Sequence, residues 1–302
     1  MIFATPLDEE FADGHIGRLC LINRFKSPEV LRANLRRTHM TSVMRSRPAS
    51  LYAMVAERSG MELNDYLLKH TLLPLKVTDD NGQSVFESAE DGSEGYQKWW
   101  LPRERRDAHF CPACAEGDIR RLGFPYWRRS HQIPGVEYCI EHDCPLISGI
   151  GAPPFLDIPR ERRAVKRIVE SKLQEVDQFN EVTKRYGQIA SLFMQGTHRV
   201  LATVADTSIR RISMELNSNA VGSQAKSNLT SRLKVSFPHA WLQVYCPELL
   251  RSDRMPSIFL GNGRCTATVS CGQIYSMVLA IAFENAEDAM KAFCPDELQI
   301  AV

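Results

Sequence analysis

The sequence predicts a mainly α-helical protein that carries one cysteine- and histidine-containing segment between its helices. Apolar residues recur every three or four positions over much of the chain, and helix-capping residues precede several of these runs. Near the middle, two short Cys/His pairs interrupt the helical pattern. The 302 residues are enough for two domains with cores of their own. We expect an N-terminal helical domain over residues 1–155 and a C-terminal helical domain over residues 156–302.

The Cys/His pairs have the spacing of a four-coordinate metal site. Two residues separate Cys111 from Cys114, and two residues also separate Cys139 from His142. This spacing lets the chain make a tight knuckle in which both side chains reach one ion. Thiolates and imidazole suit zinc, and four protein ligands leave no open position for a substrate. The pattern therefore predicts one structural Zn²⁺, with Cys144 as an alternative to His142.

The first seventy-five residues predict two pairs of helices. The apolar spacing of Ile16, Leu19 and Cys20 indicates a helix from about residue 9 to 25, and Ser27-Pro28 caps a second helix that reaches about Thr38. A further pair is expected over residues 51–60 and 65–73, with Gly60 as the stop between them. This pair resembles a helix-turn-helix, but its second helix has little basic character, so a plain helical hairpin explains the pattern equally well.

Arginines gather in two parts of the N-terminal half. They are candidate contacts to a phosphate backbone or to a partner's acidic groups, and the alternative interpretation is a solvated helix face. The candidates are Arg36, Arg37, Arg45, Arg47, Arg120, Arg121, Arg128 and Arg129. The aromatic residues Tyr126 and Trp127 lie among the second group and are expected in the core around the metal.

The residues after 156 predict further helices. A long helical pattern runs from residue 157 to about Gln195, and Gly187 is a candidate break within it. Later helices are expected over residues 204–212, 238–245 and 271–283, and Asn285 is placed to cap a last one over 286–293.

Composition narrows the class of protein. The net charge of +1 gives no global attraction to nucleic acid, so such a contact requires a local patch. No apolar run has the length of a membrane span, and the first residues lack the pattern of a secretory signal, so we expect a cytoplasmic protein without membrane contact. The sequence also lacks the common nucleophile, Walker and metalloprotease motifs, so we do not expect an enzyme.

The central segment resembles the TniQ/TnsD family of transposon target-selection proteins. The resemblance rests on Phe110-Cys-Pro-x-Cys114, on Pro125-Tyr-Trp-Arg-Arg-Ser-His131 and on Pro134-Gly-Val-x-Tyr-Cys-x-x-His142. It is looser over residues 1–75 and faint in Ser236-Phe-Pro-His-Ala-Trp-Leu242. Family members often carry a second cysteine cluster soon after the first, but residues 147–155 contain no cysteine, so a single ion is expected.

The resemblance implies a function in transposition. Such proteins connect target DNA, or a CRISPR RNA-guided effector complex, to an AAA+ ATPase regulator of the transposase, and a homodimer is one of their assembly states. A different interpretation of the same residues is a free-standing, zinc-containing helix-turn-helix regulator that binds DNA by itself. Autonomous DNA binding would show a steep dependence on salt, whereas an adaptor would need its partner.

Overall fold

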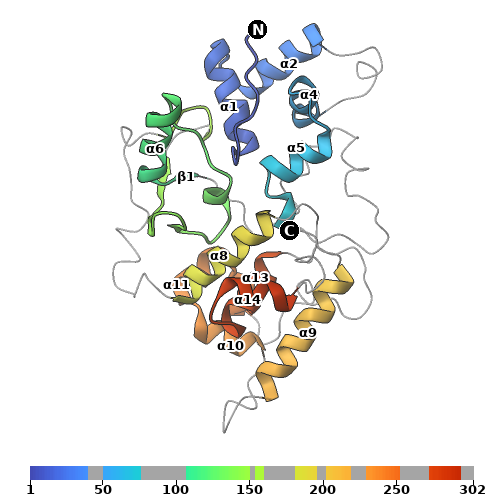
Figure 1. Cartoon of the computed structure of the whole chain (residues 1–302), viewed down its shortest axis with the longest axis vertical. Helices are drawn as coiled ribbons and strands as arrows, with labels where there is room; N and C mark the ends of the chain where they lie inside the picture. The colour runs from blue at the N-terminus through green and yellow to red at the C-terminus, as the bar shows by residue number, and fades with distance from the viewer. Residues whose placement is uncertain are drawn as a thin grey trace.

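The protein is mainly helical, as the sequence predicts. The computed structural model describes residues 1–39, 50–75, 107–149, 154–159, 181–195, 202–218, 229–251 and 272–293. In Figure 1 the N-terminal helices lie at one end of the long axis, the C-terminal helices lie at the other, and the Cys/His segment flanks them on one side. Arg45 and Arg47 fall outside the described residues.

The N-terminal end is built from two pairs of helices, close to the expected bounds. They are α1 (Ala12–Asn23), α2 (Pro28–His39), α4 (Leu51–Arg58) and α5 (Leu63–His70). The Ser50 side chain caps α4 by accepting the Ala53 N–H at 3.1 Å, and Gly60 follows α4 at φ +69°. Their apolar faces form one cluster around Leu19, Leu35 and Val55, which are essentially inaccessible to solvent.

A buried polar network connects residues 1–10, here called the N-terminal strap, to α1. Arg18 donates to both carboxylate oxygens of Glu10, at 2.8 and 2.7 Å, and to the Thr5 carbonyl at 2.8 Å. His15 lies between the Ala4 carbonyl (2.8 Å from Nε2) and the Tyr66 hydroxyl (3.0 Å from Nδ1). Because a carbonyl only accepts, Nε2 carries the ring proton and Nδ1 accepts from Tyr66. A neutral imidazole therefore satisfies both partners.

The Cys/His segment contains little regular structure. Strand β1 (Ala108–Phe110) pairs antiparallel with β4 (Ile147–Gly149), and β2 (Tyr138–Cys139) pairs antiparallel with β3 (Cys144–Pro145). Between them lie the helix α6 (Pro112–Leu122) and the 3₁₀ turn η4 (Ser130–Gln132). Strands of two or three residues are too short to be stable alone. This segment therefore needs contacts or a metal ion to hold its shape.

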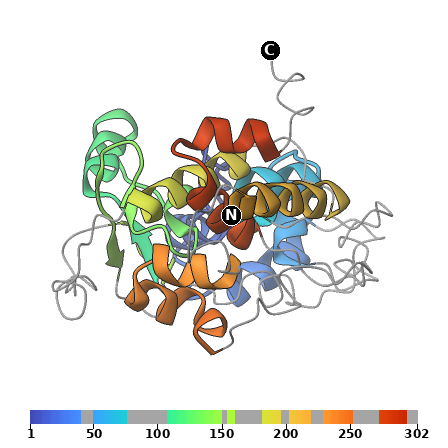
Figure 2. The ribbon, with the colours of Figure 1, turned by 90° about the horizontal axis from the view of Figure 1, so that it is seen from below.

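The C-terminal helices pack around the buried helix α13 (Gly272–Ala282), against which α8 (Glu181–Gln195) lies. The other helices in this part are α9 (Ala202–Ser218), α10 (Leu229–Ser236), α11 (His239–Tyr245), α12 (Pro247–Arg251) and α14 (Ala286–Phe293). Tyr186 on α8 meets Phe237 and Trp241 edge-on, and Phe193 meets Phe293 on α14. Figure 2 shows α8 between α14 on one side and α10 and α11 on the other.

Two expectations for this part have different outcomes. The Asn285 side chain accepts the Asp288 N–H at 2.7 Å, so the predicted cap of the last helix is confirmed. The predicted break at Gly187 is wrong, because α8 continues through this buried residue to Gln195. The apolar contacts of Ile189, Ala190 and Phe193 outweigh the low helix propensity of one glycine.

Two segments that the family resemblance singled out meet in space. The Trp241 indole N–H donates to the Gly135 carbonyl at 3.0 Å, and the Tyr186 hydroxyl donates to the Pro134 carbonyl. Gly135 has a φ of +83°, and a Cβ there would lie 2.4 Å from the Trp241 ring. The Cys/His segment thus shares a hydrophobic cluster with the C-terminal helices, and the domain boundary near residue 155 stays a prediction.

None of the helices in the described ranges combines the length and apolar character that crossing a bilayer requires.

Gly135→Ala should destabilise the protein by about 2–4 kcal/mol, because the new methyl group meets the Trp241 ring and L-residues disfavour this backbone region. Chemical denaturation followed by circular dichroism measures the loss. Gly117→Ala on α6 is the matched control. A Cβ at Gly117 meets no atom within 4 Å, so this change should be neutral or slightly stabilising. Equal stabilities of the two variants would contradict the close packing at Gly135.

Stability should fall as the pH drops below about 6.5. Burial lowers the pKa of His15 to about 3, and burial also lowers the pKa of His70. Because the unfolded chain binds a proton at each site more readily, acid favours unfolding, by up to roughly 1.4 kcal/mol per pH unit for each histidine. His15→Gln keeps a donor and an acceptor but does not titrate, so its free energy of unfolding should vary less between pH 7 and 5. The exposed His239→Gln control should keep the wild-type slope.

Candidate metal centre

Four ligand-type side chains converge at the centre of the Cys/His segment. In the described part of the chain, the ligand atoms of Cys111, Cys114, Cys139 and His142 all lie within 4.8 Å of one another. Cys111 is the N-cap of α6, Cys114 lies in its first turn, Cys139 ends β2, and His142 lies in the turn before β3. The structure therefore brings together the four residues that the spacing predicts.

The distances fit a tetrahedral zinc ion. With Zn–S bonds of about 2.3 Å and a Zn–N bond of about 2.0 Å, a tetrahedron has S···S edges of about 3.8 Å and S···N edges of about 3.5 Å. The His142 Nδ1 atom lies 3.7, 3.3 and 3.5 Å from the sulfurs of Cys111, Cys114 and Cys139. The sulfurs of Cys114 and Cys139 are 3.6 Å apart. The cluster is thus compatible with zinc binding.

The protonation equilibria of the Cys114 and Cys139 thiols also favour a cation at the centre of the cluster. A hydrogen bond from Cys114 lowers the pKa of Cys139, and contacts with His131 and His142 act in the same direction and outweigh the opposing effect of burial. The same bond to Cys139, together with burial, raises the pKa of Cys114. In the absence of a positive ion the cluster therefore favours one thiolate over two. A divalent cation removes this conflict because it stabilises all three sulfurs as thiolates.

Cys144 lies beside the cluster and is not one of its four members. Its sulfur is 3.3 Å from the sulfur of Cys111, and the residue is partly exposed. The set of mutually close ligand atoms contains His142 and omits Cys144. The geometry therefore favours His142 as the fourth ligand, which answers the alternative that the sequence left open.

Arg128 braces the metal-binding segment from within. Its guanidinium lies 2.8 Å from buried Asp118 on α6 and 3.3 Å from Glu141 in the turn before β3, and its side chain is 17% exposed. Its guanidinium carbon also lies 5.4 Å from the centroid of the Tyr126 ring. Arg128 is therefore largely committed to intramolecular partners.

Arg129 connects the segment to both ends of the molecule. It forms an ion pair of 2.6 Å with Glu9 and donates to the carbonyls of Leu68 on α5 and Met194 on α8. Its side chain is 3% exposed. The expectation that Arg129 contacts a partner is wrong for this structure, because three internal acceptors hold it in the core. The sequence offered no sign of these contacts, since Glu9 and Met194 are distant along the chain.

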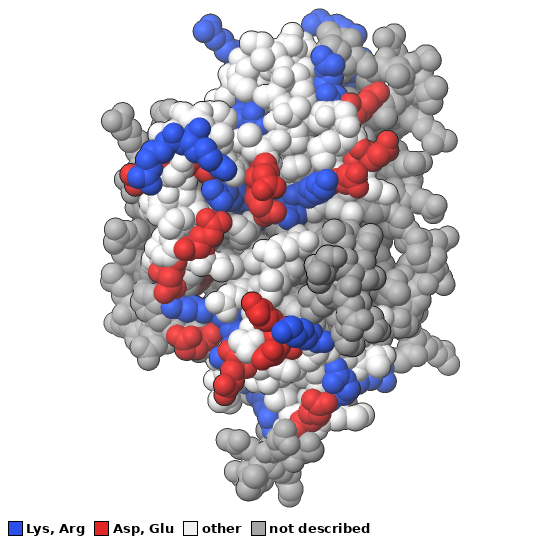
Figure 3. All heavy atoms as spheres, viewed as in Figure 1, with Lys and Arg blue, Asp and Glu red and all other residues white. Residues whose placement is uncertain are grey.

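The other candidate arginines in the described residues are exposed. Arg120 and Arg121 on α6 are 73% and 64% exposed, and Arg36 and Arg37 lie on the solvent side of α2. Figure 3 shows basic side chains gathered over α6. Trp127 is buried as expected, but it packs between Phe110 and Phe155, against Gly14 of α1.

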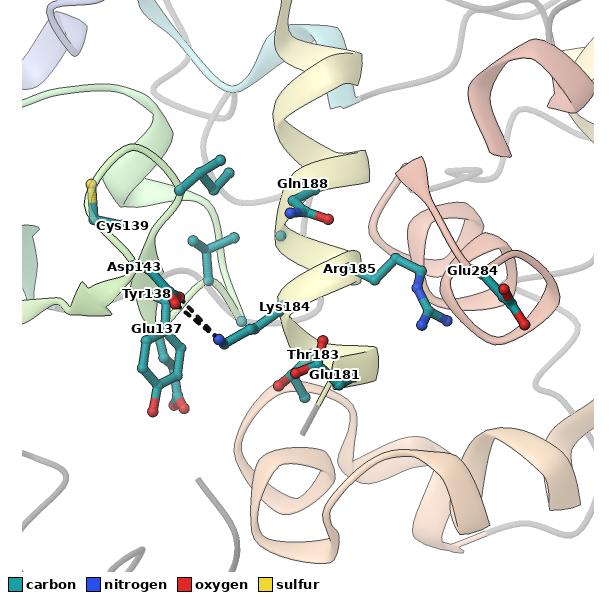
Figure 4. Close-up of a pocket in the computed structure, with 14 residues that line it drawn as sticks. Glu137, Tyr138, Cys139, Asp143, Glu181, Thr183, Lys184, Arg185, Gln188 and Glu284 are labelled. Carbon is teal, nitrogen blue, oxygen red and sulfur yellow. Dashed lines mark hydrogen bonds and ion pairs between the residues drawn. The ribbon is translucent and has the colours of Figure 1, made fainter. Parts of the chain in front are cut away.

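A groove of about 340 Å³ lies between the β2–β3 hairpin, α8 and the turn after α13. Its charged lining comprises Glu137, Asp143, Glu181, Lys184, Arg185 and Glu284. Lys184 pairs with Asp143 at 3.0 Å, as Figure 4 shows, and Arg185 donates to the Ala280 carbonyl. These two contacts tie α8 to the metal-binding hairpin on one side and to α13 on the other.

Cys111→Ser should lose the metal ion and the fold of the central segment, because metal affinity at a structural site contributes directly to folding. Elemental analysis of the purified variant should give well below one zinc per chain, with a lowered melting temperature. His142→Ala should lose most of its zinc as well. Cys144→Ser is the matched control and should keep it. Retention of full zinc content and stability by Cys111→Ser would contradict the assignment of the ligands.

Comparison with known proteins agrees with this geometry. No curated protein matches the sequence. The family model described as TniQ matches residues 1–146, a range that holds the four-residue cluster and the N-terminal helices. Residues 1–146 are therefore a TniQ domain.

Proposed function

We propose that this protein is a non-catalytic adaptor in DNA transposition. In this function it connects target DNA, or a CRISPR RNA-guided effector complex, to an AAA+ ATPase regulator of the transposase. The observation that carries the proposal is the TniQ domain, which belongs to a transposition-associated family. Zinc, bound by Cys111, Cys114, Cys139 and His142, is its structural cofactor.

The packing of the metal-binding segment supports an adaptor. An adaptor needs a stiff body, because a partner bound at one end must keep a defined orientation to a partner at the other. Arg129 reaches acceptors at the N-terminal strap, α5 and α8, so one side chain fixes three parts of the chain. Gly135 packs against Trp241 on α11 and fixes the same segment to the C-terminal helices.

The exposed arginines are the proposed contacts to nucleic acid or to an acidic partner surface. Arg120 and Arg121 project from the last turn of α6, a helix that begins at two of the metal ligands. Arg120 is near Glu116 at 3.7 Å, and both side chains are largely exposed, so this pair is weak and leaves the guanidinium available. Arg36 and Arg37 form a second basic site on α2.

Charge reversal at α6 tests this placement. The variant Arg120→Glu/Arg121→Glu should keep its zinc with only a small fall in melting temperature, because both side chains are largely exposed although Arg121 lies 3.4 Å from Asp118. It should recruit the cognate AAA+ ATPase to target DNA at least tenfold less well than the wild type in a pull-down on immobilised DNA. If the arginines contact phosphates, the salt dependence of binding should also fall by about 0.9 in logarithmic slope for each lost contact.

The matched control carries the same charge change elsewhere. Arg251→Glu/Lys291→Glu alters exposed residues of α12 and α14 and should recruit like the wild type. Equal recruitment by the α6 variant and the wild type would show that Arg120 and Arg121 are not part of the contact surface. Strong, sequence-dependent DNA binding by the protein alone, with a steep salt dependence, would instead favour the free-standing DNA-binding regulator.

A further inference from the structure

A fourth thiol lies next to a metal site that already has four ligand-type side chains. Besides the four members of the cluster, Cys144 places its sulfur 3.3 Å from that of Cys111. A structural zinc ion has four ligands, so one thiol remains uncoordinated next to a coordinated one. An uncoordinated thiol in this position can react with its neighbour.

The hairpin holds Cys144 in this position. Cys144 is directly opposite Cys139 in the β2–β3 register, so the backbone that positions one metal ligand also positions the additional thiol. Asp143, just before it, has a φ of +44° that turns the chain back toward the cluster. Cys111 is fully buried, whereas Cys144 is partly exposed and can be reached by a small solute.

We propose that Cys144 is a peroxide-reactive thiol that forms a disulfide with Cys111 and thereby opens the metal site. The attacking species is the Cys144 thiolate, a minor form because burial and Cys111 raise the pKa of this thiol to about 12. It attacks one peroxide oxygen, the O–O bond breaks, the Cys144 sulfenic acid forms, and the leaving hydroxide takes up the proton lost by the thiol and departs as water. The Cys111 sulfur then attacks the sulfenic sulfur, an S–S bond forms, and a second water leaves. Two thiols are oxidised by two electrons and one hydrogen peroxide is reduced to two water molecules.

Disulfide formation requires only a small movement of the two sulfur atoms. A disulfide has an S–S bond of about 2.05 Å, so the two sulfurs need to approach by about 1.3 Å, which side-chain rotation can supply. Once Cys111 is in the disulfide, three ligands remain for the ion. Cys111 also caps α6, because its sulfur accepts the Cys114 N–H at 3.4 Å, so the start of this helix is altered together with the metal site.

The proposal rests on the metal site described above. The experiment therefore distinguishes a failure of the disulfide proposal from a failure of the metal site. Zinc content is measured first in the untreated, reduced protein. Hydrogen peroxide is then added, zinc release is followed with a chromogenic chelator, and disulfides are assigned by peptide mass spectrometry. The wild type should release zinc with formation of a Cys111–Cys144 disulfide, and thiol reductant plus zinc should restore it.

Two variants make the result specific. Cys144→Ser should start with full zinc content and release it at least tenfold more slowly. Cys20→Ala, which alters a buried cysteine of α1, should release zinc at the wild-type rate. A dominant Cys114–Cys139 disulfide in the wild type, or unchanged release from Cys144→Ser, would overturn the proposal. An untreated Cys144→Ser protein without zinc would also overturn it, since Cys144 would then be a ligand. A zinc-free wild type would refute the metal site itself, and disulfide mapping would still decide whether Cys111 and Cys144 pair.

Discussion

The convergence of three thiols and one imidazole is the constraint on which the rest of the structure depends. The segment from Ala108 to Gly149 has strands of only two or three residues, so its backbone hydrogen bonds alone give it little stability. The three sulfurs and the imidazole nitrogen lie within 4.8 Å of one another and form the ligand set of a structural zinc site. A tetrahedral ion bound there would fix the first turn of α6 to the β2–β3 hairpin.

A few buried contacts connect the metal-binding segment to the helices at both ends of the molecule. Trp127 packs against Gly14, and a Cβ at Gly17 would overlap the Phe155 carbonyl, so α1 lies close against the residues that flank the metal segment. Arg129 reaches Glu9 and Met194, and Gly135 reaches Trp241. This irregular segment therefore helps to set how the two groups of helices are oriented, together with the direct packing of the 3₁₀ turn η1 (Leu73–Leu75) on α8 and α13. This is the property that the proposed adaptor function requires.

Much of this arrangement could be predicted from the sequence, because local chemistry determines it. The spacing of Cys111, Cys114, Cys139 and His142 identified the cluster, and caps such as Ser50 and Asn285 marked helix starts. Long-range pairing could not be predicted. Arg129 looked like an exposed arginine among others because its acceptors lie far away in the chain, and Gly187 looked like a break because its packing partners were unknown. Local signals indicate where elements begin, whereas tertiary contacts decide which side chains remain exposed.

The most direct test of the central claim is X-ray absorption spectroscopy at the zinc edge, together with elemental analysis of the purified protein. The structure predicts one zinc per chain, with three sulfur neighbours at about 2.3 Å and one nitrogen neighbour at about 2.0–2.1 Å. A protein that purifies folded without zinc would contradict the account. A shell of four sulfurs would contradict the assignment of His142 and place Cys144 in the site.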